Sequence, residues 1–223
     1  MHRVAVYYAP EAQDPLHAAA SVWLGRDAET GATLAQPNLP DVAGITADPR
    51  GYGFHATLKP PFRLANGYER FLADLRQWAA DATPFELPAL SVQDLKGFLA
   101  LRETAPCPPL HALADSAVEA LDGHRAPPTE DELARRRRAK LSEAHEALLA
   151  RWGYPYVMGE WQFHMTLTRR LTPDERDIYK PAAEAHFAGI ADIPRKVEAV
   201  CVFTQAAPGA PFLIGERISL GGR

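Results

Sequence analysis

The chain is poor in cysteine and has no long apolar run. Its 223 residues include two cysteines, Cys107 and Cys201, which lie far apart and outside any motif. This spacing argues against a disulfide framework and against a cysteine-based zinc site. The most apolar late stretch, residues 199–215, is interrupted by Gln205 and Pro208 and therefore cannot cross a bilayer as a helix. We expect a hairpin there and no membrane-spanning segment.

An excess of basic charge is also missing. The formal net charge is −4, so no global positive field attracts nucleic acid, and any anion must bind at a local patch. Long RNA is therefore a less favoured substrate.

The opening residues 1–8 indicate a strand that Pro10 follows too soon for a secretory signal. With 47% apolar and 23% charged residues, the composition is that of a globular protein, and we expect it in the cytoplasm.

What the chain does contain is one pentapeptide pattern in two copies. Residues 54–58 are Phe-His-Ala-Thr-Leu, and residues 163–167 are Phe-His-Met-Thr-Leu. Two such strings should coincide by chance in roughly one chain in a thousand of this composition. A duplicated active-site element is the better explanation.

Each copy has the alternation of a β-strand. Successive side chains of a strand point to opposite faces, so His55 and Thr57 share one face, as do His164 and Thr166. On facing strands the two pairs would surround one anion with two imidazoles and two hydroxyl groups. Because the unperturbed pKa of histidine is about 6.5, one ring can act as base and the other as acid near neutral pH. The hydroxyls would stabilise charge on the non-bridging oxygens, which predicts phosphoester chemistry that needs no metal.

Two plainer interpretations compete with this one. A single histidine on a half-buried strand is more often a structural hydrogen-bonding residue than a catalyst, but the duplication argues against that explanation. His55 and His164 could instead be metal ligands. A zinc or iron site needs a third ligand, and neither motif carries one at ligand spacing, since the nearest carboxylate is Glu160. We therefore expect neither a metal nor another cofactor.

With both motifs in view, the sequence resembles the two-histidine phosphoesterase superfamily, which includes RNA 2′,3′-cyclic phosphodiesterases and 2′-5′ RNA ligases. The longer strings at 52–62 and 151–157 are similar to the bacterial branch linked to phosphonate metabolism. The resemblance implies that four residues are catalytic and that the fold is bilobal with the site in a cleft between the lobes. These residues are His55, Thr57, His164 and Thr166.

Other residues near the motifs are candidates for substrate binding. Lys59 would share the face of His55 if the strand continues, and Arg170 would share the face of His164. Both could bind phosphate or lie in solvent. Tyr52 and Tyr156 are candidate substrate-contacting aromatics, with packing at the rim as the alternative. In the basic run 135–138, consecutive helical side chains diverge by about 100°, so one or two of the four arginines should face the cleft.

Periodicity and capping residues predict the order of elements. We expect strands at 1–8, at the two motifs, over 85–95 and 98–102, and over 197–204 and 212–220. We expect helices over 15–24, 68–80, 108–121 and 129–152, and a last helix from Thr172 that Pro181 kinks or ends. Residues 26–50 should form a loop.

This roughly repeated order predicts an α+β fold. Two pseudo-symmetric lobes, each a mainly antiparallel sheet backed by helices, would flank an active-site cleft. We treat residues 1–223 as a single bilobal domain with a lobe crossover near 105–128.

The leading functional hypothesis is a metal-independent phosphodiesterase. It would hydrolyse a small phosphodiester, cyclic and ribose-linked in one version, through acid and base catalysis by the two histidines. One alternative is a module that binds RNA or nucleotides without chemistry, for which short RNA is the partner. Another is an RNA end-ligating or phosphotransfer protein that uses the same cleft with a different attacking group.

Overall fold

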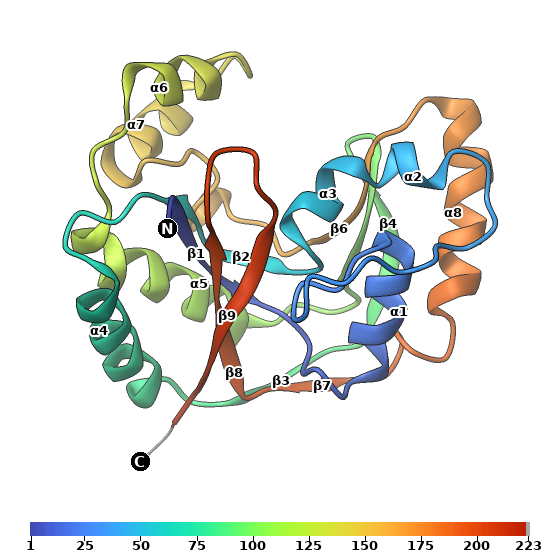
Figure 1. Ribbon diagram of the computed structural model, residues 1–223, viewed down its shortest axis with the longest axis horizontal. Coiled ribbons are helices and arrows are strands. Elements are labelled where there is room, and N and C mark those ends of the chain that lie inside the picture. Colours follow the sequence, from blue (N-terminus) through green and yellow to red (C-terminus); the bar gives the residue numbers. More distant parts are fainter. Residues whose placement is uncertain (222–223) are drawn as a thin grey trace.

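The structure is a computed structural model, and it describes residues 1–221 (Figure 1). Two segments form short 3-10 helices, Asp122–His124 and Met158–Glu160. The strands are β1 (Arg3–Tyr8), β2 (Ala56–Phe62), β3 (Phe85–Leu87), β4 (Leu90–Leu95), β5 (Phe98–Glu103), β6 (Met165–Arg170), β7 (Arg195–Val197), β8 (Ala199–Gln205) and β9 (Phe212–Ser219). The α-helices are α1 (Pro15–Leu24), α2 (Val42–Ile45), α3 (Ala47–Tyr52), α4 (Tyr68–Asp81), α5 (Pro108–Leu121), α6 (Glu130–Arg137), α7 (Glu143–Trp152) and α8 (Pro173–Phe187).

Seven strands form one antiparallel sheet in the order β4-β5-β6-β2-β1-β8-β9, and β3 pairs separately with β7. The two motif strands, β2 and β6, are neighbours at the middle of the sheet. They are joined by one residue pair, Ala56 with Met165. The sheet therefore divides there into two lobes, β4-β5-β6 and β2-β1-β8-β9, each with one motif strand, which confirms the predicted two-lobed α+β fold.

The helices cover each lobe separately. Helices α4 and α5 pack on the lobe that contains β2, where α5 contacts β2 and α4 contacts β9 (Figure 1). Helices α1 and α8 pack on the other lobe, where α8 contacts β4 and α1 contacts β6. Trp23 of α1 is fully buried, and its indole Nε1 donates to the Leu167 carbonyl of β6 at 3.1 Å. This packing leaves the histidine face of the motif strands for the site.

Each lobe combines strands from distant parts of the chain. The hairpin β4–β5 pairs through β5 with β6, which lies far later in the sequence. The hairpin β8–β9 pairs through β8 with β1 at the start of the chain. Periodicity indicates each hairpin but carries no signal for its partner strand. The lobe crossover at 105–128 stays a prediction.

Local capping signals confirm several predicted helix boundaries. Asp14 caps α1 by accepting from the Leu16 amide, and Gly25 ends this helix in the left-handed region at φ 77°. Thr129 and Thr172 each form a capping box with the glutamate three residues later. Side-chain groups at these positions satisfy amides that the helix itself leaves unpaired.

Three secondary-structure expectations were wrong. The loop expected at 26–50 contains α2 and the start of α3, two helices too short to show a periodic pattern. The strand expected over 85–95 is two strands, since β3 ends at Leu87 and pairs with β7. The helix expected over 129–152 is α6 and α7, separated where Lys140 has a φ of 49°. At Pro181 the last helix does not end, since α8 continues to Phe187; a kink at this residue stays a prediction.

No helix within residues 1–221 has both the length and the apolar character needed to cross a membrane. The apolar stretch at 199–215 forms most of the hairpin β8–β9, as its composition predicts.

Candidate active site

The single pair between the motif strands places the two copies of the motif directly opposite each other. Ala56 and Met165 are the middle residues of the two His-x-Thr strings, and both are fully buried. His55 and His164 directly precede the two strands, and extending the antiparallel register by one residue on each side sets His55 across from Thr166 and Thr57 across from His164. Directly opposed β-carbons lie about 5 Å apart and diagonal ones about 7 to 8 Å apart. The two imidazoles and two hydroxyls therefore meet on one face.

Both imidazoles are fixed in the same tautomer. The Nδ1 atom of His55 lies 2.8 Å from the Gly53 carbonyl, and that of His164 lies 2.8 Å from the Gln162 carbonyl. A carbonyl oxygen can only accept, so each Nδ1 carries a hydrogen and donates it. The Nε2 atom of each ring is left to exchange a proton with a ligand in the cleft.

The environment of the two rings disfavours their charged forms. The pKa of His55 is lowered to about 4, mainly by burial and also by the nearby His164, while the hydrogen bond to Gly53 opposes the shift. Burial also lowers the pKa of His164, the Gln162 carbonyl opposes this, and Arg102 lowers it further. Both rings are thus neutral near pH 7 when no anion is bound.

Aromatic rings hold the histidines in place. The ring of Tyr7 on β1 stacks on His55 with centroids 3.8 Å apart and planes 19° apart. On the other lobe, Phe98 of β5 meets the His164 ring edge-on at 5.8 Å. Packing against these two aromatic rings restricts rotation of the imidazoles.

All four motif side chains line one cleft. Its volume is about 340 Å³, and His55, Thr57, His164 and Thr166 lie on its wall together with Tyr7. This volume is within the range of about 300 to 1,000 Å³ that small-molecule sites have in proteins. A ligand in the cleft can therefore contact both copies of the motif.

Two arginines of the basic run 135–138 face this cleft, as expected from their helical positions. Arg135 and Arg136 of α6 line it, together with Arg3 of β1. Arg137 instead pairs with Glu146 at 3.0 Å, on the opposite side of the helix. The site therefore combines two acid–base groups with local positive charge, although the whole chain is acidic.

Lys59 does not join the cleft, and the expected position of its side chain is wrong. Between the pairs Val6–Lys59 and Tyr7–Thr57 the register of β1 and β2 shifts by one residue, a β-bulge that reverses the alternation after Thr57. The Lys59 side chain is buried, and its Nζ donates to the Val118 carbonyl and to Asp122 Oδ1. It stabilises the contact between β2 and α5.

The other three residues proposed for substrate binding lie at the rim. Tyr52 of α3 is 40% exposed and lines the cleft beside His55. Tyr156 is 42% exposed and lines an adjoining hollow beside His164. Arg170 lines the same hollow, and its guanidinium donates to the Lys96 carbonyl. Their contact with substrate stays a prediction.

Three residues with a part in the site carry no signal in the sequence. Arg3 is one charged residue in an apolar strand, and Phe98 begins a strand distant from both motifs. Trp161 donates from its Nε1 to the Thr57 carbonyl at 2.7 Å, which ties the segment before the second motif to the first motif strand. All three depend on pairings between distant parts of the chain, which local patterns do not reveal.

Within the described residues, no three side chains of His, Cys, Asp or Glu are grouped so that they could hold a metal ion. Glu160, the carboxylate nearest to the second motif in sequence, lies 3.1 Å from His145 Nε2.

Comparison with known proteins gives one family and several relatives. Residues 57–213 match the family described as "Protein of unknown function (DUF1045)". The chain is 41% identical over 234 residues to a protein of Janthinobacterium sp. (strain Marseille) named "Ribose 1,5-bisphosphate phosphokinase PhnN", covering 100% of this chain and 52% of that protein. It is 38% identical over 217 residues to a protein of Laribacter hongkongensis (strain HLHK9) with the same name, covering 94% of this chain and 50% of the relative. The chain thus spans about half the length of these curated relatives.

Among solved structures, the chain is similar to E. coli LigT complexed with NADP+. The TM-score is 0.46 at 14% sequence identity, and the match covers 98% of this chain and 97% of that one.

Proposed function

Since the chain belongs to the family described as protein of unknown function DUF1045, whose description names no reaction, we propose a function from the cleft itself. It is a phosphoesterase that hydrolyses a small phosphodiester by acid–base catalysis with His55 and His164. The observation that carries this proposal is the pairing of Ala56 with Met165, which sets the two His-x-Thr motifs opposite each other in one cleft.

The reaction assigns one role to each ring. The Nε2 atom of His55 takes a proton from water as the water oxygen forms a bond to phosphorus. The bond from phosphorus to the leaving oxygen breaks, and that oxygen receives a proton from Nε2 of protonated His164. We assign the base to His55 because burial lowers its pKa to about 4, which keeps this ring neutral. Throughout the reaction each Nδ1 keeps its hydrogen and donates it to a main-chain carbonyl.

The two threonines stabilise the charge that develops. A phosphodiester gains negative charge on its non-bridging oxygens as water attacks, and hydroxyl donors fixed in advance lower the energy of that state. Thr57 and Thr166 line the cleft beside the imidazoles. The register of the motif strands supports a position for each hydroxyl opposite the histidine of the other motif.

We further propose a ribose-linked cyclic phosphate as the substrate class. Hydrolysis of such a ring leaves a ribose phosphate monoester, and the names of the relatives from Janthinobacterium and Laribacter contain a ribose phosphate. The cleft volume of about 340 Å³ suits a sugar phosphate rather than a folded polymer. The resemblance to the bacterial branch linked to phosphonate metabolism supports the same metabolic setting for this reaction.

The test is turnover of a 2′,3′-cyclic nucleotide by the purified chain. We expect ring opening to a phosphomonoester, at a rate that a metal chelator does not change, because the two histidines supply both proton transfers. Product analysis separates hydrolysis from ligation, which would join the phosphate to a second nucleoside. Loss of the rate on chelation, with recovery on adding back a divalent ion, would point to a metal-dependent reaction instead.

The pKa values predict an acidic optimum for kcat/KM. The free enzyme needs one neutral and one protonated imidazole. Activity should therefore fall below about pH 4, where His55 becomes protonated. It should fall again above the pKa of His164, which lies below the usual 6.5. The value of kcat/KM at pH 8 should then be at least about tenfold below the optimum, because above the pKa of the acid it falls by a factor of about ten for each pH unit.

This profile is measured on a cyclic phosphodiester, whose own phosphate stays ionised across the range. The acidic and basic sides of the profile report the titration of the two rings as a coupled pair. The prediction therefore holds whichever ring is the base. Values of kcat/KM that stay constant or rise between about pH 6.5 and 8 would contradict it.

A further inference from the structure

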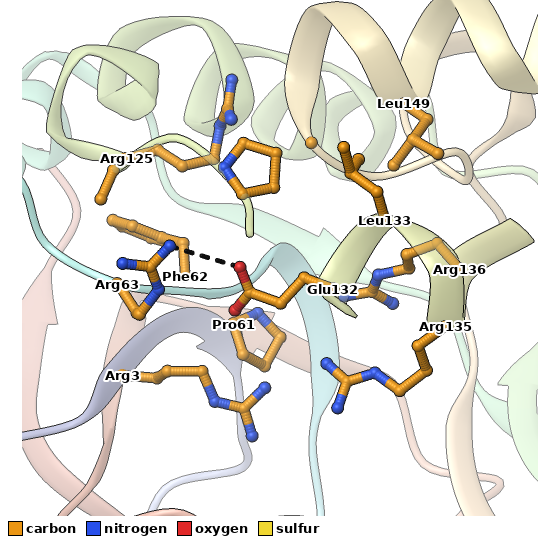
Figure 2. A pocket seen from close by; sticks show the side chains of 13 residues that line it. Arg3, Pro61, Phe62, Arg63, Arg125, Glu132, Leu133, Arg135, Arg136 and Leu149 are labelled. Carbon is orange, nitrogen blue, oxygen red and sulfur yellow. Dashed lines mark hydrogen bonds and ion pairs between the residues drawn. The ribbon is translucent and has the colours of Figure 1, made fainter. Parts of the chain in front are cut away.

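A recess lined by arginines lies between β1, the end of β2 and α6 (Figure 2). Its volume is about 40 Å³. By the same measure one water molecule needs about 10 to 15 Å³, so the recess holds a group of a few oxygen-sized atoms, the scale of a phosphate. Its charged side chains are Arg3, Arg63, Arg125, Arg135, Arg136 and Glu132.

Nearby carboxylates neutralise only part of this charge. Glu132 pairs with Arg63 at 3.3 Å, and Asp122 pairs with Arg125 at 2.8 Å. Of the ion pairs formed within residues 1–221, none includes Arg3, Arg135 or Arg136. Guanidinium groups that share one recess repel each other, and a bound anion would remove this repulsion.

Two of these three arginines, Arg3 and Arg136, are also held in place before any ligand binds. Arg3 Nε donates to Gln205 Oε1 at 2.8 Å, which leaves its other nitrogens free to donate elsewhere. The Arg136 guanidinium lies over the Tyr154 ring at 4.4 Å. Figure 2 shows Arg3 and Arg135 extending toward each other from β1 and α6. Donors fixed in this way lose little freedom when they bind an anion.

The recess and the catalytic cleft share part of their walls. Arg3, Arg135 and Arg136 line both, and the cleft continues from them to His55 and His164. A ligand with its reacting phosphate between the histidines can therefore extend a second group into the recess.

We propose that this recess binds a second phosphate group of the same substrate, a terminal monoester. Arginine is suited to this group because its planar donors bind phosphate oxygens in pairs. The inference rests on the proposed function and narrows its substrate to a sugar that carries both a cyclic phosphodiester and a phosphate monoester. A phosphodiester of an RNA strand has similar chemistry, but the acidic chain, at a net charge of −4, and the small recess favour the monoester.

The test compares adenosine 2′,3′-cyclic phosphate with and without a 5′-phosphate. For the unmodified protein we expect kcat/KM to be about tenfold to a hundredfold higher with the 5′-phosphate, the range for hydrogen bonds between charged groups. In Arg135→Ala and Arg136→Ala this ratio should fall toward one. Arg138→Ala is the matched control, because Arg138 is exposed at the end of the same helix and does not line the cleft, and its ratio should stay unchanged.

Equal kcat/KM for the two nucleotides in the unmodified protein would overturn the inference, as would equal losses for both in the Arg135 and Arg136 variants. A preference that appears only with an oligonucleotide ending in a cyclic phosphate would also overturn it. Calorimetric titration of the same two nucleotides covers the case of no turnover. If neither nucleotide is turned over, the proposed reaction is wrong. A dissociation constant that is lower with the 5′-phosphate would still support phosphate binding in the recess, and equal dissociation constants would reject it.

Discussion

His55→Ala and His164→Ala should each lower kcat for a 2′,3′-cyclic nucleotide by about a hundredfold to ten-thousandfold, the range for a lost general acid or base. The reason lies in the geometry of the rings. Each Nδ1 is bound to a carbonyl, which leaves Nε2 of each ring for proton exchange, so in the proposed reaction each ring supplies one proton transfer. Alanine removes that transfer without removing the arginines that line the cleft. The loss should therefore appear mainly in kcat and less in KM.

The double variant refines this expectation. Two groups that act in one step do not contribute independently, so His55→Ala combined with His164→Ala should be little worse than the more damaging single variant. His186→Gln is the matched control, because His186 lies on α8 and contacts the Ala19 carbonyl away from the cleft. Retention of more than about a tenth of kcat in either single alanine variant would show that its ring is not an acid or base in this reaction.

Thr57→Val and Thr166→Val carry the second large expected effect. Valine keeps the branched shape that suits a strand but lacks the hydroxyl. Removing one donor to a developing oxyanion typically costs about a hundredfold to a thousandfold in kcat, and we expect this for each threonine. Thermal unfolding should change little, because both side chains lie at the cleft wall and are only partly buried.

Serine variants provide the control for the threonines. Thr57→Ser and Thr166→Ser keep the hydroxyl and lose the methyl group, so they should retain most of kcat. If the serine and valine variants lose activity equally, the threonines act through packing, and their proposed role as donors is wrong. Measuring kcat and KM separately for all four variants distinguishes these outcomes.

Local patterns in the sequence predicted the parts of this molecule that depend on neighbours in the chain. The alternation in the motifs indicated two strands that present a histidine and a threonine on one face. The capping residues Asp14, Thr129 and Thr172 marked helix starts that the structure confirms. Each of these signals acts over one to four residues, so the surrounding fold has little influence on it.

The parts that the sequence could not predict depend on distant partners. The wrong face of Lys59 comes from a bulge whose position is set by pairing with β1. The contribution of Arg3 depends on where α6 lies in space, and the hairpin β4–β5 could not be assigned to β6 from periodicity. A one-residue shift in pairing moves every later side chain of a strand to the opposite face of the sheet. Alternation therefore predicts the face of a residue only as far as the next bulge.

The join between the lobes has a consequence for how the distance between the two imidazoles is maintained. Ala56 and Met165 form the one residue pair between β2 and β6, and each stands next to a histidine. Main-chain geometry at a buried position therefore sets this distance, and surface segments such as α6 and α7 do not. Substitutions on those helices can alter which ligands enter while the spacing of the reacting groups stays constant. In the proposed reaction, the choice of ligand can therefore be altered separately from the proton transfers.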